Sequence, residues 1–97
     1  DFGPGMGGAD GYIFPPNPRG VIVPPENPPG SVRGRRLRVQ FWVAADGGVT
    51  RVAITPEIED AKYRREFHER MMHYRFYPAT TRDGRHVSSV IAISITP

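Results

Sequence analysis

The side chains of this 97-residue chain that are best suited to chemistry are three histidines, His68, His73 and His86. Imidazole nitrogens bind transition metals and transfer protons near neutral pH. His68 and His73 are five residues apart on an expected helix, which separates them by about 140° around the helix axis, so they do not converge on one ion. The chain has no cysteine, and no acid completes a ligand set around His86. We therefore expect no metal site and no cofactor.

Other catalytic motifs are equally weak. No Ser-His-Asp arrangement is supported, and the glycines of residues 3–8 lack the strand-to-helix context of a phosphate-binding loop. We therefore expect no catalytic residues and no enzyme. No apolar run approaches the ~20 residues that a membrane-spanning helix needs, so any membrane anchor is expected to lie outside this sequence or in a partner.

Arginine dominates the charge of the chain, because twelve arginines and one lysine face ten acids and leave a net charge of +3. A basic surface favours anionic partners such as nucleic acid, phospholipid or an acidic protein. Arg36 and Arg38 alternate with apolar residues and share the solvent face of an expected strand with Trp42. Tryptophan and arginine are enriched at binding hot spots. We expect these three residues to contact a protein partner. Packing of Trp42 under the N-terminal residues is an equal alternative for that side chain, and nucleic-acid binding by the arginine-rich face is the weaker alternative to a protein partner.

The stretch over residues 36–54 organises the expected fold. Apolar residues at every second position from Leu37 to Val43 predict a half-buried strand. Asp46 and Gly47 predict a type I′ hairpin turn, after which residues 49–54 form the return strand.

A helix and further extended segments are expected after this hairpin. Asp60 is the expected N-cap of a helix over residues 61–74. The apolar stripe of this helix consists of Tyr63, Phe67, Met71 and Tyr74. Residues 75–79 are expected to be extended, residues 82–85 to turn, and residues 86–96 to form one last strand. Such a strand must pair with a neighbour or be exposed as an edge.

We expect residues 1–34 to be a Gly/Pro-rich leader and residues 35–97 to be the folded domain. Eight of the eleven prolines and eight of the eleven glycines precede residue 35, and proline pairs enforce an extended backbone. A pure spacer has no need of exposed apolar side chains, yet the leader carries Tyr12, Phe14 and Ile22. We expect a strap that these residues pin to the domain itself or to a partner, and a mobile leader is the alternative.

The expected fold class is α+β: a small antiparallel sheet in ββαβ order, with one helix on one face and the extended leader in front. In this arrangement the chain resembles the C-terminal domain of the TonB family over residues 32–96. The blocks that resemble the family, in the family's order, are residues 39–43, 46–49, 52–54, 74–79 and 83–87. Tyr74 stands where the family usually has tryptophan.

The resemblance implies a periplasmic, non-enzymatic interaction module. In that family the last strand accepts a short peptide of an outer-membrane transporter by strand addition. The acceptor here would be residues 86–96, and the partner-binding residues along it would be Val87, Ser88, Val90, Ala92 and Ser94. Partners would be proteins at or near a membrane. The alternative is a structural accessory subunit of a larger membrane complex, and strand exchange into a dimer also remains open.

Overall fold

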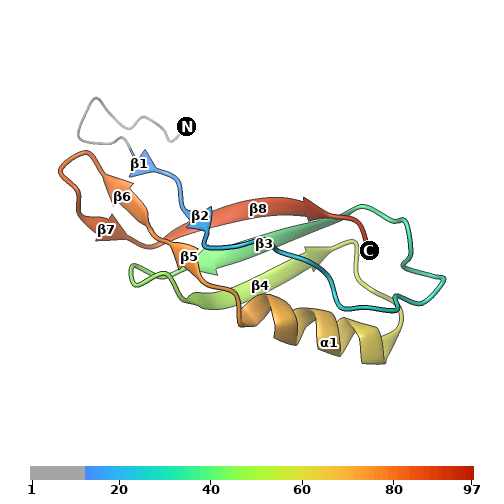
Figure 1. Ribbon diagram of the computed structural model, residues 1–97. Coiled ribbons are helices and arrows are strands. Elements are labelled where there is room, and N and C mark those ends of the chain that lie inside the picture. The colour runs from blue at the N-terminus through green and yellow to red at the C-terminus, as the bar shows by residue number, and fades with distance from the viewer. Residues whose placement is uncertain (1–12) are drawn as a thin grey trace.

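The largest sheet is built on the strand that the alternating sequence predicts. The computed structural model, which describes residues 13–97, places β3 (Leu37–Val43) between β4 (Val49–Thr55) and β8 (Ser89–Ile95), antiparallel to both. Alternate side chains of β3 are buried, because every second residue of a strand faces the same side. The helix α1 (Ala61–Met72) lies along this sheet (Figure 1). The described part of the chain is thus an α+β fold with one helix and antiparallel sheets, which confirms the expected class.

The helix α1 begins at the predicted cap. The Asp60 carboxylate accepts a hydrogen bond from the Tyr63 N–H at 2.8 Å, which satisfies one of the free amides of the first turn. Tyr63, Phe67 and Met71 are buried in the core that α1 shares with β3. The helix is two residues shorter than predicted, so Tyr74 lies beyond its C-terminal end.

The turn between β3 and β4 differs from the predicted type I′ turn. A type I′ turn needs a positive φ at both central residues, but Gly47 has a φ of 90° and Asp46 has no positive φ. The Gly47 N–H donates to the Ala44 carbonyl at 2.9 Å, and the Ala44 N–H donates to the Gly48 carbonyl at 2.8 Å. This pattern is that of a type I turn followed by a glycine in the left-handed region.

The last extended stretch is two strands, so the prediction of one strand over residues 86–96 is wrong. β7 (His86–Val87) pairs with β6 (Ala79–Thr81), whereas β8 pairs with β3. The chain changes partners at Ser88, so β7 and β8 do not share one ladder. β1 (Ile13–Phe14) pairs with the other edge of β6 and completes a second sheet, which extends past one end of the larger one (Figure 1).

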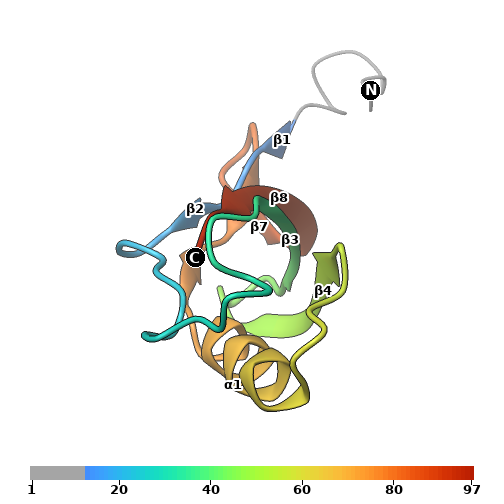
Figure 2. The same cartoon turned by 90° about the vertical axis from the view of Figure 1, so that its right-hand side faces the viewer.

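After β1, the leader runs along the side of the molecule between β8 and α1, as the end-on view in Figure 2 shows. β2 (Asn17–Pro18) pairs with β5 (Phe76–Tyr77). Farther along the chain, Ile22 packs against the core and Val32 is buried within it. The core therefore includes side chains from the leader. The domain to which the leader belongs holds this part of it in place.

Two tyrosine hydroxyls also hold the leader. The Tyr63 hydroxyl donates to the Pro25 carbonyl at 2.9 Å. The Tyr74 hydroxyl donates to the Val23 carbonyl and accepts from the Val23 N–H, both at 3.0 Å. Tyr63 is 3% exposed, and this burial raises the pKa of its hydroxyl above the ordinary value. The bond to Pro25 therefore depends on a protonated, buried side chain.

Replacing Tyr63 with phenylalanine should lower the free energy of unfolding at pH 7 by about 1 kcal/mol, since one buried hydrogen bond is lost. Above a pH of about 10 the unfolded tyrosine ionises while the folded one stays protonated. The stability that the raised pKa provides is complete below that pH and is lost as the pH rises through the folded pKa. The difference between the native chain and the variant should therefore shrink above pH 10 in urea titrations. Tyr77→Phe removes the hydroxyl of an exposed tyrosine and is the control for the substitution itself. A pH profile of Tyr63→Phe identical to that of the native chain would contradict the assignment.

Candidate partner-binding site

The sheet face opposite the one covered by α1, here called the open face, carries rows of side chains that lie directly opposite one another across the strands. Residues paired across antiparallel strands point to the same side of a sheet. Each row runs from β4 across β3 to β8, and the rows are Thr55, Arg38 and Ser94; Ala53, Gln40 and Ala92; and Arg51, Trp42 and Val90. All of these residues are exposed or half-buried, whereas the alternate residues of β3 are in the core.

Trp42 has a cationic neighbour on the open face. The guanidinium carbon of Arg51 lies 4.5 Å from the centre of the Trp42 ring, within the range of a cation–π contact. The Thr50 hydroxyl donates to the Trp42 carbonyl at 3.3 Å. Arg51 was not among the residues predicted from the sequence. Its position opposite Trp42 follows from the register of the hairpin, which has an irregularity between Trp42 and Val43.

A hollow of about 380 Å³ lies beside Trp42, where β8 begins. Its lining brings together the predicted residues Trp42, Ser88 and Val90. The full lining consists of Trp42, Val43, Ala44, Thr50, Ser88, Ser89 and Val90. Ser89 Oγ is buried and has no hydrogen-bond partner among the described residues. The hollow thus offers an aromatic wall, small side chains and serine oxygens.

The outer edge of β8 lacks the features that usually protect an edge strand. Within residues 13–97, β3 is its one strand neighbour, and no backbone hydrogen bond reaches its other side. Natural edges are commonly blunted by charges, proline or bulges, but β8 reads SVIAISI, without a charge or a proline, and its pairing with β3 is regular. Ala92 and Ser94 are exposed along it, and Val90 is 47% exposed.

The remaining predicted residues of the sheet lie apart from the Trp42 hollow. Arg38 is on the open face at the other end of β3, in the row of Ser94, and Arg36 is exposed just before that strand. Val87 is half-buried in β7, which belongs to the second sheet. The arginines therefore form a separate part of the open face.

The described leader residues that were predicted to bind a partner lie apart from the open face. Phe14 lies in β1 and is 47% exposed, and Ile22 packs against the core of its own domain. Tyr12 is outside the described residues. Trp42 lies on the open face beside Arg51, whereas residues 17–34 of the leader follow the side between β8 and α1 (Figure 2).

The second sheet contains one carboxylate, Asp83, whose pKa is shifted. The Thr81 hydroxyl donates to the Asp83 carboxylate in the turn between β6 and β7, and this bond lowers the pKa of Asp83. The contact stabilises the predicted turn over residues 82–85, which the structure confirms.

The described residues contain no group of three or more His, Cys, Asp and Glu side chains that could hold a metal ion. Over residues 13–97, no helix is both long enough and apolar enough to cross a membrane. Compared with protein-family models, curated proteins and solved structures, the chain has no match in any of the three.

Proposed function

We propose that this domain is a non-enzymatic protein–protein interaction module, which binds an extended segment of a partner by strand addition to the outer edge of β8. The observation that carries the proposal is the state of that edge: β8 is a seven-residue strand without a charge or a proline, and it has no second strand neighbour among residues 13–97. An added strand would pair the outward N–H and C=O groups, and main-chain hydrogen bonds would supply the affinity.

Side chains beside this edge would select the partner. An added strand points alternate side chains to the open face, where they would lie next to Val90, Ala92 and Ser94. The hollow between Trp42 and Val90 would accept one of these side chains near the start of β8. An apolar or aromatic residue fits that position best, because the ring of Trp42 forms one wall.

The resemblance to the TonB C-terminal domain supports the same use of the last strand, and with it a TonB-like ββαβ fold and a periplasmic location. The partner would then be a peptide of an outer-membrane transporter. A structural subunit of a membrane complex is the second candidate, and the leader favours it. Although its own domain holds the leader, Val21 is 83% exposed and Phe14 and Val23 are 47% and 44% exposed, so apolar side chains remain available to neighbours. Stoichiometric co-purification with a large complex in detergent would favour the second candidate.

Site-specific photo-cross-linking tests the proposal. A photoreactive residue placed at Ala92, in cells that naturally make the protein, should give a defined adduct whose partner peptide maps to an extended segment. The same residue at Lys62, which is exposed on α1, should give no such adduct. Absence of an adduct at Ala92, or equal adducts at both positions, would overturn the proposal.

A pair of charge variants separates strand addition from binding across the sheet. Ala92 and Gln40 are neighbours on the open face, but Ala92 is in the edge strand and Gln40 in the central one. A lysine at the edge hinders an incoming strand. With the photoreactive residue moved to Ser94, which is exposed in the same strand, we expect Ala92→Lys to reduce the adduct about tenfold and Gln40→Lys to leave it nearly unchanged. Equal losses would show that the partner lies across the face instead.

A further inference from the structure

The opposite edge of the same sheet has a groove of its own. In the part of the chain that the structure describes, β4 is an edge strand, and a groove of about 400 Å³ lies between it and α1. Its apolar lining comes from Ile54, Ile58 and Ala61, and its polar and charged lining from Glu57, Arg64, Arg65 and His68. An exposed strand edge beside a helix is a geometry in which peptides bind as an added strand.

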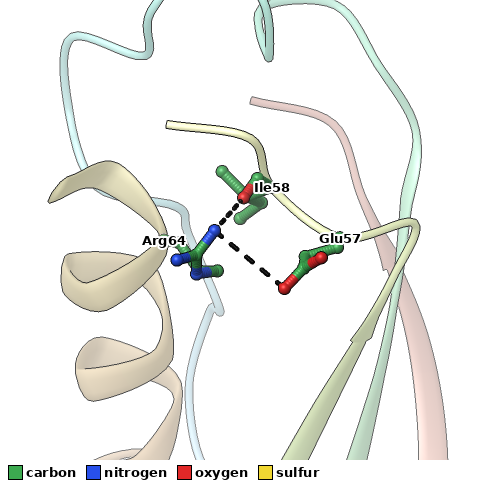
Figure 3. Close-up of polar contacts among 3 residues, drawn as sticks. All are labelled: Glu57, Ile58 and Arg64. Atoms are coloured by element: carbon green, nitrogen blue, oxygen red, sulfur yellow. Dashed lines mark hydrogen bonds and ion pairs between the residues drawn. The ribbon is translucent and has the colours of Figure 1, made fainter. Parts of the chain in front are cut away.

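One end of the groove is held in shape by Arg64 (Figure 3). Its guanidinium donates to the Ile58 carbonyl at 2.8 Å and lies 4.0 Å from the Glu57 carboxylate. These contacts join α1 to the segment that follows β4. The single acid of the lining therefore faces an arginine of the domain itself, while Arg65 and His68 are exposed to a ligand.

The regular part of the β4 edge is short. Trp42 lies opposite Arg51 and Val43 opposite Val49, so Thr50 is an extra residue that interrupts the ladder. Residues 51–55 remain as the regular edge. An added strand would point alternate side chains into the groove and onto the open face. Arginine lies on both sides, with Arg65 in the groove and Arg51 on the open face.

We propose that the groove between β4 and α1 binds a short, extended, acidic segment of a protein, paired with residues 51–55. Its carboxylates would meet Arg65, and an apolar side chain would contact Ile54. Nucleic acid is anionic as well, but its backbone has no alternating N–H and C=O groups to pair with a strand edge. This second docking edge goes beyond the proposed use of β8 and stands independently of it.

Binding of a fluorescent peptide of alternating Glu and Val residues tests the inference. At low salt, fluorescence anisotropy should show saturable binding. A matched peptide with Lys in place of Glu should bind at least about tenfold more weakly because of charge repulsion. A central proline, which removes one N–H donor, should weaken binding by a similar factor. Equal binding of the Lys peptide, or no saturable binding of the Glu peptide, would overturn the proposal.

A matched pair of charge reversals locates the peptide. Arg65→Glu, in the groove, should weaken binding about tenfold. Lys62→Glu makes the same charge change on α1 outside the groove and should weaken it less than about threefold. The loss of affinity in Arg65→Gln should lie between those of the two reversals. Because this variant only removes the charge, it shows whether a folding defect causes the effect of Arg65→Glu. Equal effects of Arg65→Glu and Lys62→Glu would contradict the site.

Hydrogen exchange separates this inference from the proposed function. The bound peptide should protect backbone amides of residues 51–55. Protection of residues 89–95 alone would place the peptide on β8, which would refute the second site and leave the first intact. An oligothymidylate that binds more tightly than the Glu peptide and loses affinity in Arg65→Glu would make the groove a nucleic-acid site and would also refute the inference.

Discussion

Replacing Gly47 with alanine is expected to destabilise the domain far more than the same replacement of Gly84. Both glycines have a positive φ, 90° and 85°, at which a Cβ atom is strained by about 1–2 kcal/mol. An added Cβ at Gly84 has no heavy atom within 4 Å, whereas at Gly47 it would overlap the carbonyl oxygen of Phe76. The Phe76 N–H also donates to the Gly47 carbonyl at 2.9 Å, so the two backbone segments cannot separate without losing that bond.

The clash at Gly47 reaches the core, because the Phe76 side chain is buried there. We expect Gly84→Ala to cost about 1–2 kcal/mol and Gly47→Ala at least about 2 kcal/mol more. Urea denaturation of the two variants measures the difference directly. Equal midpoints would mean that the β3–β4 turn and the start of β5 are not in contact in solution.

The second large effect is expected at Phe41, which is fully buried, with its ring centre 5.1 Å from that of Phe76. Phe41→Ala should reduce the free energy of unfolding by about 3–5 kcal/mol, through lost apolar burial and the cavity left behind. A domain of this size has a total stability of about 5–15 kcal/mol. The variant should therefore unfold at much lower urea concentration or fail to fold.

Trp42 is the matched control, because it is the next residue of β3, is even larger, and faces the other side. It is half-buried on the open face, where Arg51 covers part of its ring. We expect Trp42→Ala to cost less than about 2 kcal/mol while it weakens the cross-link at Ala92. If Trp42→Ala lowered the free energy of unfolding as much as Phe41→Ala does, the open face would have to be covered in the free protein.

Patterns of neighbouring residues correctly predicted β3 and the start of α1. The alternation from Leu37 to Val43 identified β3 and its buried face, because the period of a strand determines which side chains point together. Asp60 identified the start of α1, because a carboxylate at that position binds a free amide of the first turn. The edge position of β8 also agrees with the expectation that a β-rich terminal strand pairs on one side or is exposed.

Features that arise from tertiary packing were not predictable in the same way. The turn type was wrong because Gly47 alone supplies the positive φ. The break at Ser88 depends on a change of pairing partner that no local residue preference encodes. The groove between β4 and α1 was not predicted, because Ile54 and His68 line the same groove only once the helix has packed against the sheet. The spacing of Ala61, Arg64, Arg65 and His68 along one helix face, next to the buried stripe, is the signal that could have indicated it.

The attachment of the leader has a mechanical consequence. Between Ile13 and Val32 it is attached through a succession of small contacts: the β1–β6 pairing, the β2–β5 pairing, and the bonds to Tyr74 and Tyr63. A pulling force applied on the N-terminal side of Ile13 would load these contacts one after another rather than together. The leader should therefore detach from the domain one contact at a time, while the β3 sheet stays folded until Val32 is drawn from the core.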